Sequence, residues 1–258
     1  MMWAGRALKA RAHTSFVASR QRIASKALTK GLRITSEIRG QFPKDLATLI
    51  VPNHIGTLDP WVLAANFDVA FVAKSEMGEW PVIRTVCKAV AIIFAHRKNV
   101  MKTADTLNEI QDRMRSGVSV LIFPEGTTSD GVGLLPFKTT GFQAVAGMED
   151  GFVLPVYHHV RSVNGVPVDI NSRTAVTWHS GQGMLPNILG VLALGPLHYV
   201  IRIGDAIPAS GKNRKELAQE TQEAVRQLMQ QEIDELAKIH SKSSPATINV
   251  SQEQEAPV

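Results

Sequence analysis

The chain has 258 residues, of which 44% are hydrophobic and 20% charged, as in an ordinary globular protein. This composition argues against wholesale disorder and against a polytopic membrane protein, and a single cysteine, Cys87, excludes an internal disulfide and a multi-thiolate zinc site. The net charge is +5, but residues 1–36 contain eight Lys and Arg residues and no acid. The basicity is therefore a local feature of the N-terminus.

Residues 1–40 are predicted to form a basic helical arm that associates with membranes. Its cations suit an anionic membrane surface, at about 1 kcal/mol per Lys or Arg near the headgroups. The positive charge alone would also suit nucleic acid or an import receptor as a binding partner. Of these two, we expect nucleic acid not to be a partner. Because the apolar residues spread around the helical wheel, a solvated basic helix is the alternative to an interfacial one. No window reaches the roughly 18 to 20 apolar residues that a membrane span needs.

Between residues 46 and 160, short apolar runs alternate with helix-like stretches, which predicts an α/β sheet. The predicted strands are Leu46–Val51, Val69–Ala73, Ala91–Ala95, Val118–Phe123 and Phe152–Val156. The predicted helices are Pro60–Phe67, Pro81–Ala89, Thr103–Arg115 and Gly141–Met148. Residues 161–210 are less periodic, and a last helix runs from near Asn213 to about His240, with Glu216 placed for a capping box. One domain is thus expected over residues 41–240, followed by a disordered tail over residues 241–258.

The first candidate motif is Asn53-His54 with Asp59 five residues after the histidine, directly after a predicted strand. A neutral imidazole is suited near pH 7 to remove the proton of a hydroxyl group as its oxygen attacks another group. A carboxylate on the other ring nitrogen would fix the tautomer and stabilise the imidazolium. Taken alone the pair is weak evidence, because a His-x4-Asp spacing arises by chance about 0.4 times in such a chain. Asp59-Pro60 also fits the ordinary start of a helix.

The second candidate motif is the segment Phe123–Gly131, which again follows a predicted strand. Its glycine amides, hydroxyls and the carboxylate of Glu125 suit a polyol and an anionic group, although a glycine-rich connecting loop is the plain alternative. Lys74 and Arg97 follow the second and third predicted strands. Because ligands bind beyond strand ends in open α/β sheets, the sequence predicts one cleft there.

In combination, these segments resemble the lysophosphatidic acid acyltransferase family, also called the PlsC-type glycerolipid acyltransferases. The resemblance covers about residues 46–160, and its blocks are Asn53-His54 to Asp59, Val90–Arg97, Phe123–Ser129 and Leu154-Pro155-Val156. It implies a single-domain glycerolipid acyltransferase fold of the α/β class, with a mixed sheet flanked by helices. It also implies an acyl-CoA or acyl-carrier-protein donor, no cofactor and no metal site.

The resemblance implies His54 as general base, Asp59 as its partner and Arg97 as a phosphate ligand. The remaining residues expected to bind substrate are Asn53, Lys74, Glu125, Gly126, Thr127, Thr128 and Lys138. By contrast, His158 and His159 point to opposite faces of a strand and are expected to be structural.

The expected function is that of a lysophosphatidic acid O-acyltransferase-like enzyme at the cytoplasmic face of a bacterial inner membrane. The acid-free N-terminus also permits an organellar transit peptide. The sequence departs from the family at Val90, where glycine is usual, and at Thr128, where arginine is expected. A hydroxyl cannot replace the bidentate contact of arginine with a phosphate, so a lyso-ornithine lipid or another lysolipid is the alternative acceptor. A thioesterase or lipid hydrolase and a non-catalytic lipid-binding protein are the competing functions, and the oligomeric state stays open.

Overall fold

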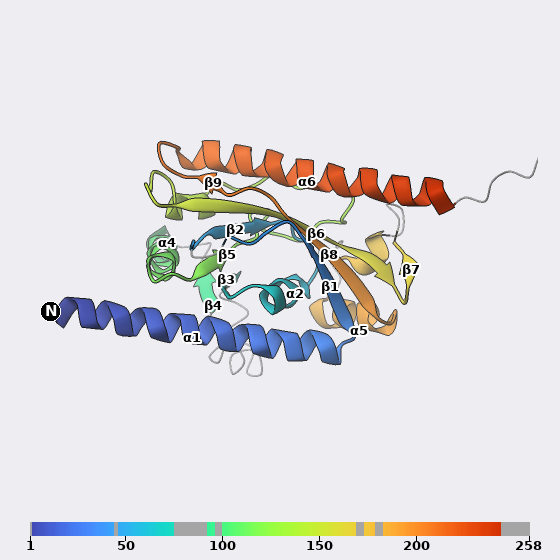
Figure 1. Ribbon diagram of the computed structural model, residues 1–258, viewed down its shortest axis with the longest axis horizontal. Coiled ribbons are helices and arrows are strands. Elements are labelled where there is room, and N and C mark those ends of the chain that lie inside the picture. The colour runs from blue at the N-terminus through green and yellow to red at the C-terminus, as the bar shows by residue number, and fades with distance from the viewer. Residues whose placement is uncertain are drawn as a thin grey trace, which may run out of the picture.

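One mixed β-sheet organises the protein, with helices on both faces (Figure 1). The computed structural model describes residues 2–43, 46–74, 92–95, 100–168, 173–178 and 183–243. The strands are β1 (Ile34–Arg39), β2 (Leu49–Pro52), β3 (Val69–Lys74), β4 (Ile92–Ala95), β5 (Ser119–Leu121), β6 (Phe152–Val163), β7 (Val166–Pro167), β8 (Leu197–Ile203) and β9 (Ile207–Pro208). They follow the order β1-β8-β6-β2-β5-β3-β4, and β7 and β9 pair with β6.

Parallel pairing places the carboxyl ends of the central strands at one edge of the sheet. β2 pairs in parallel with β5 and with the first half of β6, and β3 pairs in parallel with β5 and β4. The second half of β6 pairs antiparallel with β8, which pairs in parallel with β1. The loops after β2 and β5 therefore emerge side by side, as expected for a ligand-binding edge.

Helices cover both faces of this sheet. The helices are α1 (Met2–Gly31), α2 (Asp59–Asn66), α4 (Val100–Arg115), α5 (Met184–Ala193) and α6 (Arg214–Ser243), with short 3-10 helices η2 (Gly141–Ala144) and η3 (Arg173–Val176). In Figure 1, α6 lies above the sheet and α1 lies below it. Within the described residues, no helix is both long and apolar enough to cross a bilayer.

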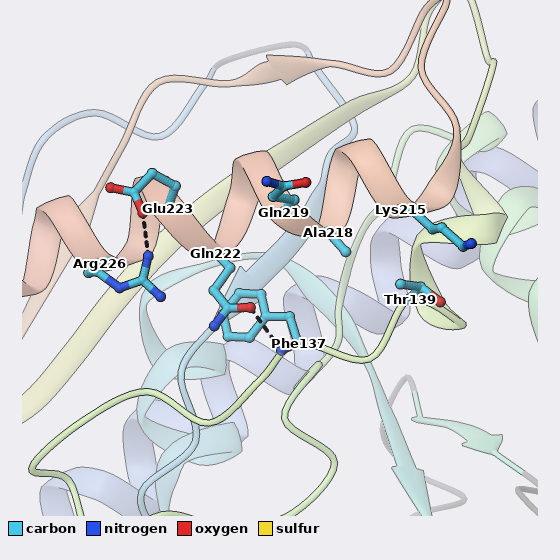
Figure 2. Close-up of a pocket in the computed structure, with 8 residues that line it drawn as sticks. All are labelled: Phe137, Thr139, Lys215, Ala218, Gln219, Gln222, Glu223 and Arg226. Carbon is cyan, nitrogen blue, oxygen red and sulfur yellow. Dashed lines mark hydrogen bonds and ion pairs between the residues drawn. The ribbon is translucent and has the colours of Figure 1, made fainter.

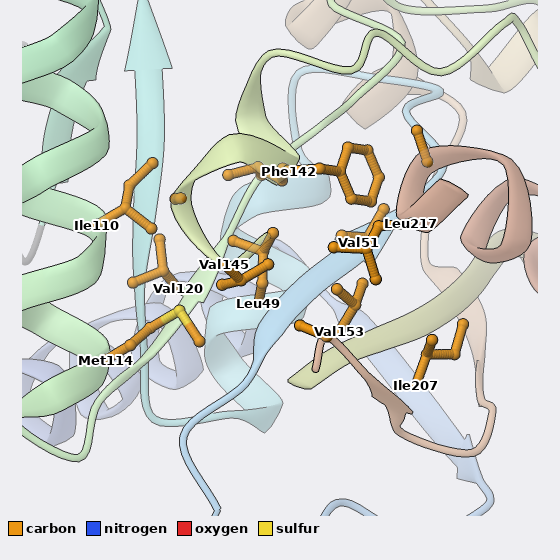
Figure 3. Packing of buried hydrophobic residues seen from close by; sticks show 14 of the residues in the cluster. Leu49, Val51, Ile110, Met114, Val120, Phe142, Val145, Val153, Ile207 and Leu217 are labelled. Atoms are coloured by element: carbon orange, nitrogen blue, oxygen red, sulfur yellow. The ribbon is translucent and has the colours of Figure 1, made fainter. Parts of the chain in front are cut away.

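The alternation of side chains along the strands separates two hydrophobic clusters. On one face, Leu49 and Val51 pack with residues of α4, η2 and α6, including Ile110, Phe142 and Leu217 (Figure 3). On the other face, Ile50 joins a cluster that contains Val62, Leu63 and Ala64 of α2 and reaches α5. Two buried clusters on a continuous sheet explain why β2 is apolar at every one of its first three positions.

The five predicted strands are confirmed, with ends shifted by at most three residues, except that β6 continues to Val163 instead of ending at Val156. The helix predicted over Gly141–Met148 is wrong in length, because only Gly141–Ala144 form a 3-10 helix and Gly147 adopts a positive φ of 75°. The last helix is confirmed, with Asn213 and Glu216 forming the expected reciprocal cap, and it continues to Ser243. The predicted helix Pro81–Ala89 and the rest of the predicted tail lie outside the described residues.

The N-terminal helix ends at Gly31 and not near residue 40. Arg33 adopts a positive φ of 56°, and the chain then enters β1, which forms an edge of the sheet. Residues 34–39 therefore belong to the sheet, and the irregular region 161–210 supplies their partner strand β8. Both strands were absent from the sequence prediction.

A buried ion cluster fixes α6 to the second half of β6 and to β8. Glu232 is fully buried and accepts hydrogen bonds from His159 Nε2 at 3.0 Å and from Arg202 Nε at 2.6 Å, with Arg161 Nη2 at 2.8 Å. Burial raises the pKa of Glu232, but these partners outweigh it and hold the pKa at about 2. His159 therefore has a structural role, as predicted from its strand position.

Candidate active site

The turn after β2 folds back on itself through the carboxylate of Asp59. Asp59 Oδ2 accepts hydrogen bonds from His54 Nδ1 at 2.8 Å, from the Ile55 amide at 2.7 Å and from the Gly56 amide at 2.8 Å. Asp59 is fully buried in the first turn of α2, where a negative charge is favourable. Burial raises the pKa of this carboxyl, but the imidazoles of His158 and His54 and the backbone donors together hold it below its ordinary value. An ionised carboxylate therefore faces His54.

The imidazole of His54 presents its second nitrogen to the surroundings. Because Nδ1 is held by Asp59, Nε2 is the nitrogen available to a substrate, and no described residue bonds to it. The ring stacks on Phe123 with centroids 4.0 Å apart and keeps 18% of its side chain exposed. This pattern, one nitrogen on a carboxylate and the other accessible, is the arrangement of a general base.

The two motifs of the sequence meet at the backbone of His54. Glu125 Oε1 accepts a hydrogen bond from the His54 amide at 2.9 Å, and the Ser129 amide donates to the His54 carbonyl at 2.8 Å. The second carboxylate oxygen of Glu125 accepts from the Leu135 amide at 3.2 Å. Segments that lie more than 70 residues apart in sequence are thus joined by hydrogen bonds to the amide and the carbonyl of His54.

Glu125 is a buried group with a perturbed protonation equilibrium. The residue is 2% exposed, and burial raises its pKa to about 7, although the hydrogen bonds from the His54 and Leu135 amides act in the opposite direction. Both carboxylate oxygens are occupied by backbone donors. The geometry therefore shows that Glu125 positions the backbone of His54, and its contact with the acceptor stays a prediction.

The side-chain amide of Asn53, another residue expected to bind substrate, is buried and bonded to β6. Nδ2 donates to the His158 carbonyl at 3.0 Å and Oδ1 accepts from the His158 amide at 2.9 Å, so the side chain extends the ladder between β2 and β6. Burial lowers the pKa of His158, whose ring therefore donates from Nε2 to the Asn53 carbonyl at 3.0 Å. His158 Nε2 also lies 3.7 Å from Asp59 Oδ2, which makes it a neighbour of the catalytic turn that the sequence did not reveal.

The accessible side of the second motif is formed by Gly126, Thr127, Thr128 and Lys138. Gly126 has a φ of 73°, and a Cβ atom there would lie 2.6 Å from Lys138 Nζ, so the lysine side chain passes directly over the glycine. Thr127 is exposed and Thr128 is half-buried. These groups present hydroxyls and one cation beside the turn that carries His54.

A third segment, absent from the sequence prediction, closes over the catalytic turn. The Trp178 amide donates to the Ile55 carbonyl at 2.8 Å, and Thr177 Oγ1 donates to the Asp130 carbonyl at 3.3 Å. The buried guanidinium of Arg173 donates to the Gly131 carbonyl at 3.2 Å. The loop that follows β5 is therefore held from its outer side by residues 173–178.

A groove of about 470 Å³ lies elsewhere, along α6 (Figure 2). Its floor contains Phe137, whose amide donates to Gln222 Oε1 at 3.0 Å, and an ion pair joins Glu223 and Arg226. Neither His54 nor Asp59 lines it. Within the described part of the chain, no group of three or more His, Cys, Asp or Glu residues could hold a metal ion.

Comparison with known proteins shows to which family this chain belongs. A family model described as Acyltransferase matches residues 33–159. A lyso-ornithine lipid O-acyltransferase of Rhizobium meliloti is 30% identical over 226 residues, covering 85% of this chain and 77% of the relative. A second such enzyme, of Brucella abortus, is 33% identical over 198 residues, covering 74% of each. The chain belongs to the PlsC-type acyltransferase family. It is therefore an O-acyltransferase, as predicted from its two motifs.

A solved acyltransferase shares the fold. The crystal structure of PlsC, the 1-acyl-sn-glycerophosphate acyltransferase of Thermotoga maritima, is 19% identical, with a TM-score of 0.61, and the match covers 96% of this chain and 91% of that one. The predicted α/β acyltransferase fold with a mixed sheet is confirmed. The family match begins at residue 33, which places β1 inside the acyltransferase domain.

Two expected substrate-binding residues of this acyltransferase cannot be placed relative to His54. Lys74 ends β3 at the same edge of the sheet, but its side chain lies outside the described part of the structure, as does the whole of Arg97. The acyltransferase site that the structure describes is therefore the turn around His54 and Asp59 together with the loop around Gly126.

Proposed function

We propose that this acyltransferase esterifies the hydroxyl of a lysolipid, with His54 as general base and Asp59 as its partner. The observation that carries the proposal is the 2.8 Å bond between His54 Nδ1 and Asp59, which leaves Nε2 accessible. Nε2 takes the proton of the acceptor hydroxyl as its oxygen attacks the thioester carbonyl. The C–S bond then breaks, and the imidazolium returns the proton to the thiolate. The ionised Asp59 stabilises the imidazolium between these steps.

The preferred acceptor is a lyso-ornithine lipid. Two relatives that match over most of their length carry that name, and Thr128 stands where a phosphate-binding arginine is expected. Hydroxyls from Thr127 and Thr128 suit the amide and zwitterionic groups of an aminolipid. Lysophosphatidic acid is the second candidate, because Lys138 places a cation beside Gly126.

The donor in this proposal is acyl-CoA or acyl-carrier protein, and the reaction needs no cofactor. The proposed location is the cytoplasmic face of a bacterial inner membrane, where the enzyme is held as a peripheral protein by the basic helix α1. Deletion of residues 1–33 is expected to weaken binding to anionic vesicles, most strongly at low salt.

A direct assay tests the activity and the acceptor together. The purified protein is incubated with labelled acyl-CoA or acyl-carrier protein and a panel of lysolipids, and the acylated product is identified by mass. Acyl transfer that falls by at least about 10²-fold in His54→Ala supports the proposal. His198→Ala removes another partly exposed histidine, on β8, and serves as the matched control. Transfer at near-normal rate by His54→Ala would sink the mechanism, and fatty-acid release without an acceptor would indicate a hydrolase.

A further inference from the structure

Helix α5 is apolar on its exposed side as well as on the side buried against the protein, where Val191 is 5% exposed. Its residues carry no charge, and Leu185 and Leu189, one turn apart, are 57% and 60% exposed. The opposite side contains Asn187, which is 8% exposed and donates to the Thr177 carbonyl at 3.1 Å. A surface helix in water buries its apolar side and exposes its polar side, so this arrangement calls for an apolar partner.

Helix α1 also exposes apolar side chains. Phe16 and Ile23 are 58% and 66% exposed. The side buried against the protein is small or polar, and consists of Ala18, Gln21, Ser25 and Thr29. The exposed side also carries the cations Arg20, Lys26 and Lys30. Exposed aromatic and aliphatic residues mixed with cations are typical of a helix that lies in a lipid interface.

These two helices lie on the same side of the sheet. Helix α1 packs mainly against α2, and Val191 of α5 belongs to the hydrophobic cluster that contains Leu63 of α2. Ala18 of α1 also joins the other cluster, on which α6 packs. In Figure 1, α1 and α5 lie below the sheet and α6 lies above it. Two helices with exposed apolar residues therefore face outward in the same general direction.

We propose that the outward faces of α1 and α5 form one membrane-docking surface, into which the leucines of α5 bring an uncharged insertion element. An anionic bilayer is the occupant that fits, because it supplies headgroups for the cations of α1 and an acyl region for Leu185 and Leu189. This surface adds to the basic arm a second contact that does not depend on charge.

The position of α5 also connects the bilayer to the catalytic turn. Asn187 bonds to Thr177, Thr177 bonds to Asp130, and the adjoining Trp178 bonds to Ile55, next to His54. A lipid surface at α5 thus lies two contacts from the proposed base. This part of the inference rests on the proposed lysolipid acceptor, whereas the docking surface itself does not.

Vesicle binding by Leu185→Glu/Leu189→Glu tests the surface. In sedimentation with vesicles containing phosphatidylcholine and phosphatidylglycerol, each leucine replaced is expected to weaken binding by at least about 10-fold. This loss of binding should persist at high salt. Gln219→Glu/Gln227→Glu adds the same charges to exposed positions of α6, on the other side of the sheet, and is expected to bind nearly as wild type. Unchanged binding by the leucine variant overturns the proposal.

Two further measurements keep the outcome clear. Leu189→Trp is expected to bind more tightly and to be quenched by brominated lipid beyond the wild-type protein, and absence of added quenching overturns the insertion of α5. A lipid-free dimer that Leu185→Glu/Leu189→Glu abolishes would assign this face to a second copy of the chain instead. Acyl transfer is measured separately in detergent micelles with the wild-type protein. Its absence refutes the proposed function and leaves the vesicle result intact.

Discussion

Replacement of Glu125 by glutamine is expected to change how the stability of the protein depends on pH. Burial raises the pKa of Glu125 from 4.5 to about 7, so the folded state binds its proton more tightly than the unfolded state does. The bound proton therefore stabilises the folded state fully below pH 4.5, and this stabilisation is lost as the pH rises through about 7. A shift of roughly 2.5 units corresponds to about 3 kcal/mol, of which about 2.5 kcal/mol falls between pH 5 and pH 8.5. Glutamine does not ionise and removes this dependence.

The assay is urea unfolding of both proteins at pH 5 and at pH 8.5. Between pH 5 and pH 8.5, the wild-type protein is expected to lose about 2.5 kcal/mol of unfolding free energy relative to Glu125→Gln. The glutamine side chain places an amide group beside the Leu135 backbone amide, which lowers the stability of the variant. This loss is the same at both pH values, so it cancels in that comparison. Glu149→Gln, at an exposed glutamate, is the matched control and should show no such movement. A change below about 0.5 kcal/mol for Glu125→Gln would refute the reasoning.

Three further substitutions test the site and the core. Asp59→Asn removes the charge that faces the imidazole of His54, so kcat is expected to fall by at least about 10²-fold with little change in KM; a loss below 10-fold contradicts the pairing. Gly126→Ala places a Cβ atom at a residue with a φ of 73° and against the side chain of Lys138. The substitution should lower the unfolding free energy by about 1 kcal/mol and Tm by a few degrees. Adding Lys138→Ala to the same protein should remove the contact with the lysine but not the backbone strain. Glu232→Ala removes the buried carboxylate that bonds His159, Arg161 and Arg202 but leaves Glu235 beside the two arginines, so urea unfolding should show a loss of about 1.5–3 kcal/mol, whereas a loss below about 0.5 kcal/mol refutes the role of the cluster.

The part of the site that sequence could predict is the part that is local. Asp59 returns to His54 across a short turn, and five residues of spacing were enough to propose it. The support for that turn comes from Ser129, from His158 and from the segment that contains Trp178, which are 70 to more than 100 residues away along the chain. No spacing rule reports such contacts, because they depend on which strands become neighbours.

The fold shows the same limit. β2, β3 and β5 are apolar runs between turn residues and were predicted, whereas β1 was hidden at the end of a helical pattern. β8 was hidden after Gly195-Pro196 in an irregular region, although five of its seven residues are buried. Each of these two strands is stabilised by the other, and a pairing between residues roughly 160 positions apart leaves no periodic trace in either segment.

That pairing has a consequence for synthesis of the chain. At about 5–20 residues per second, a ribosome makes β8 about 8–30 s after β1, and β1 stays without this sheet neighbour throughout. Helix α1 precedes β1 and forms from local contacts, so it can reach a bilayer during that interval. An early membrane contact would then hold the unpaired strand away from other nascent chains, which would protect a slow, long-range fold from aggregation.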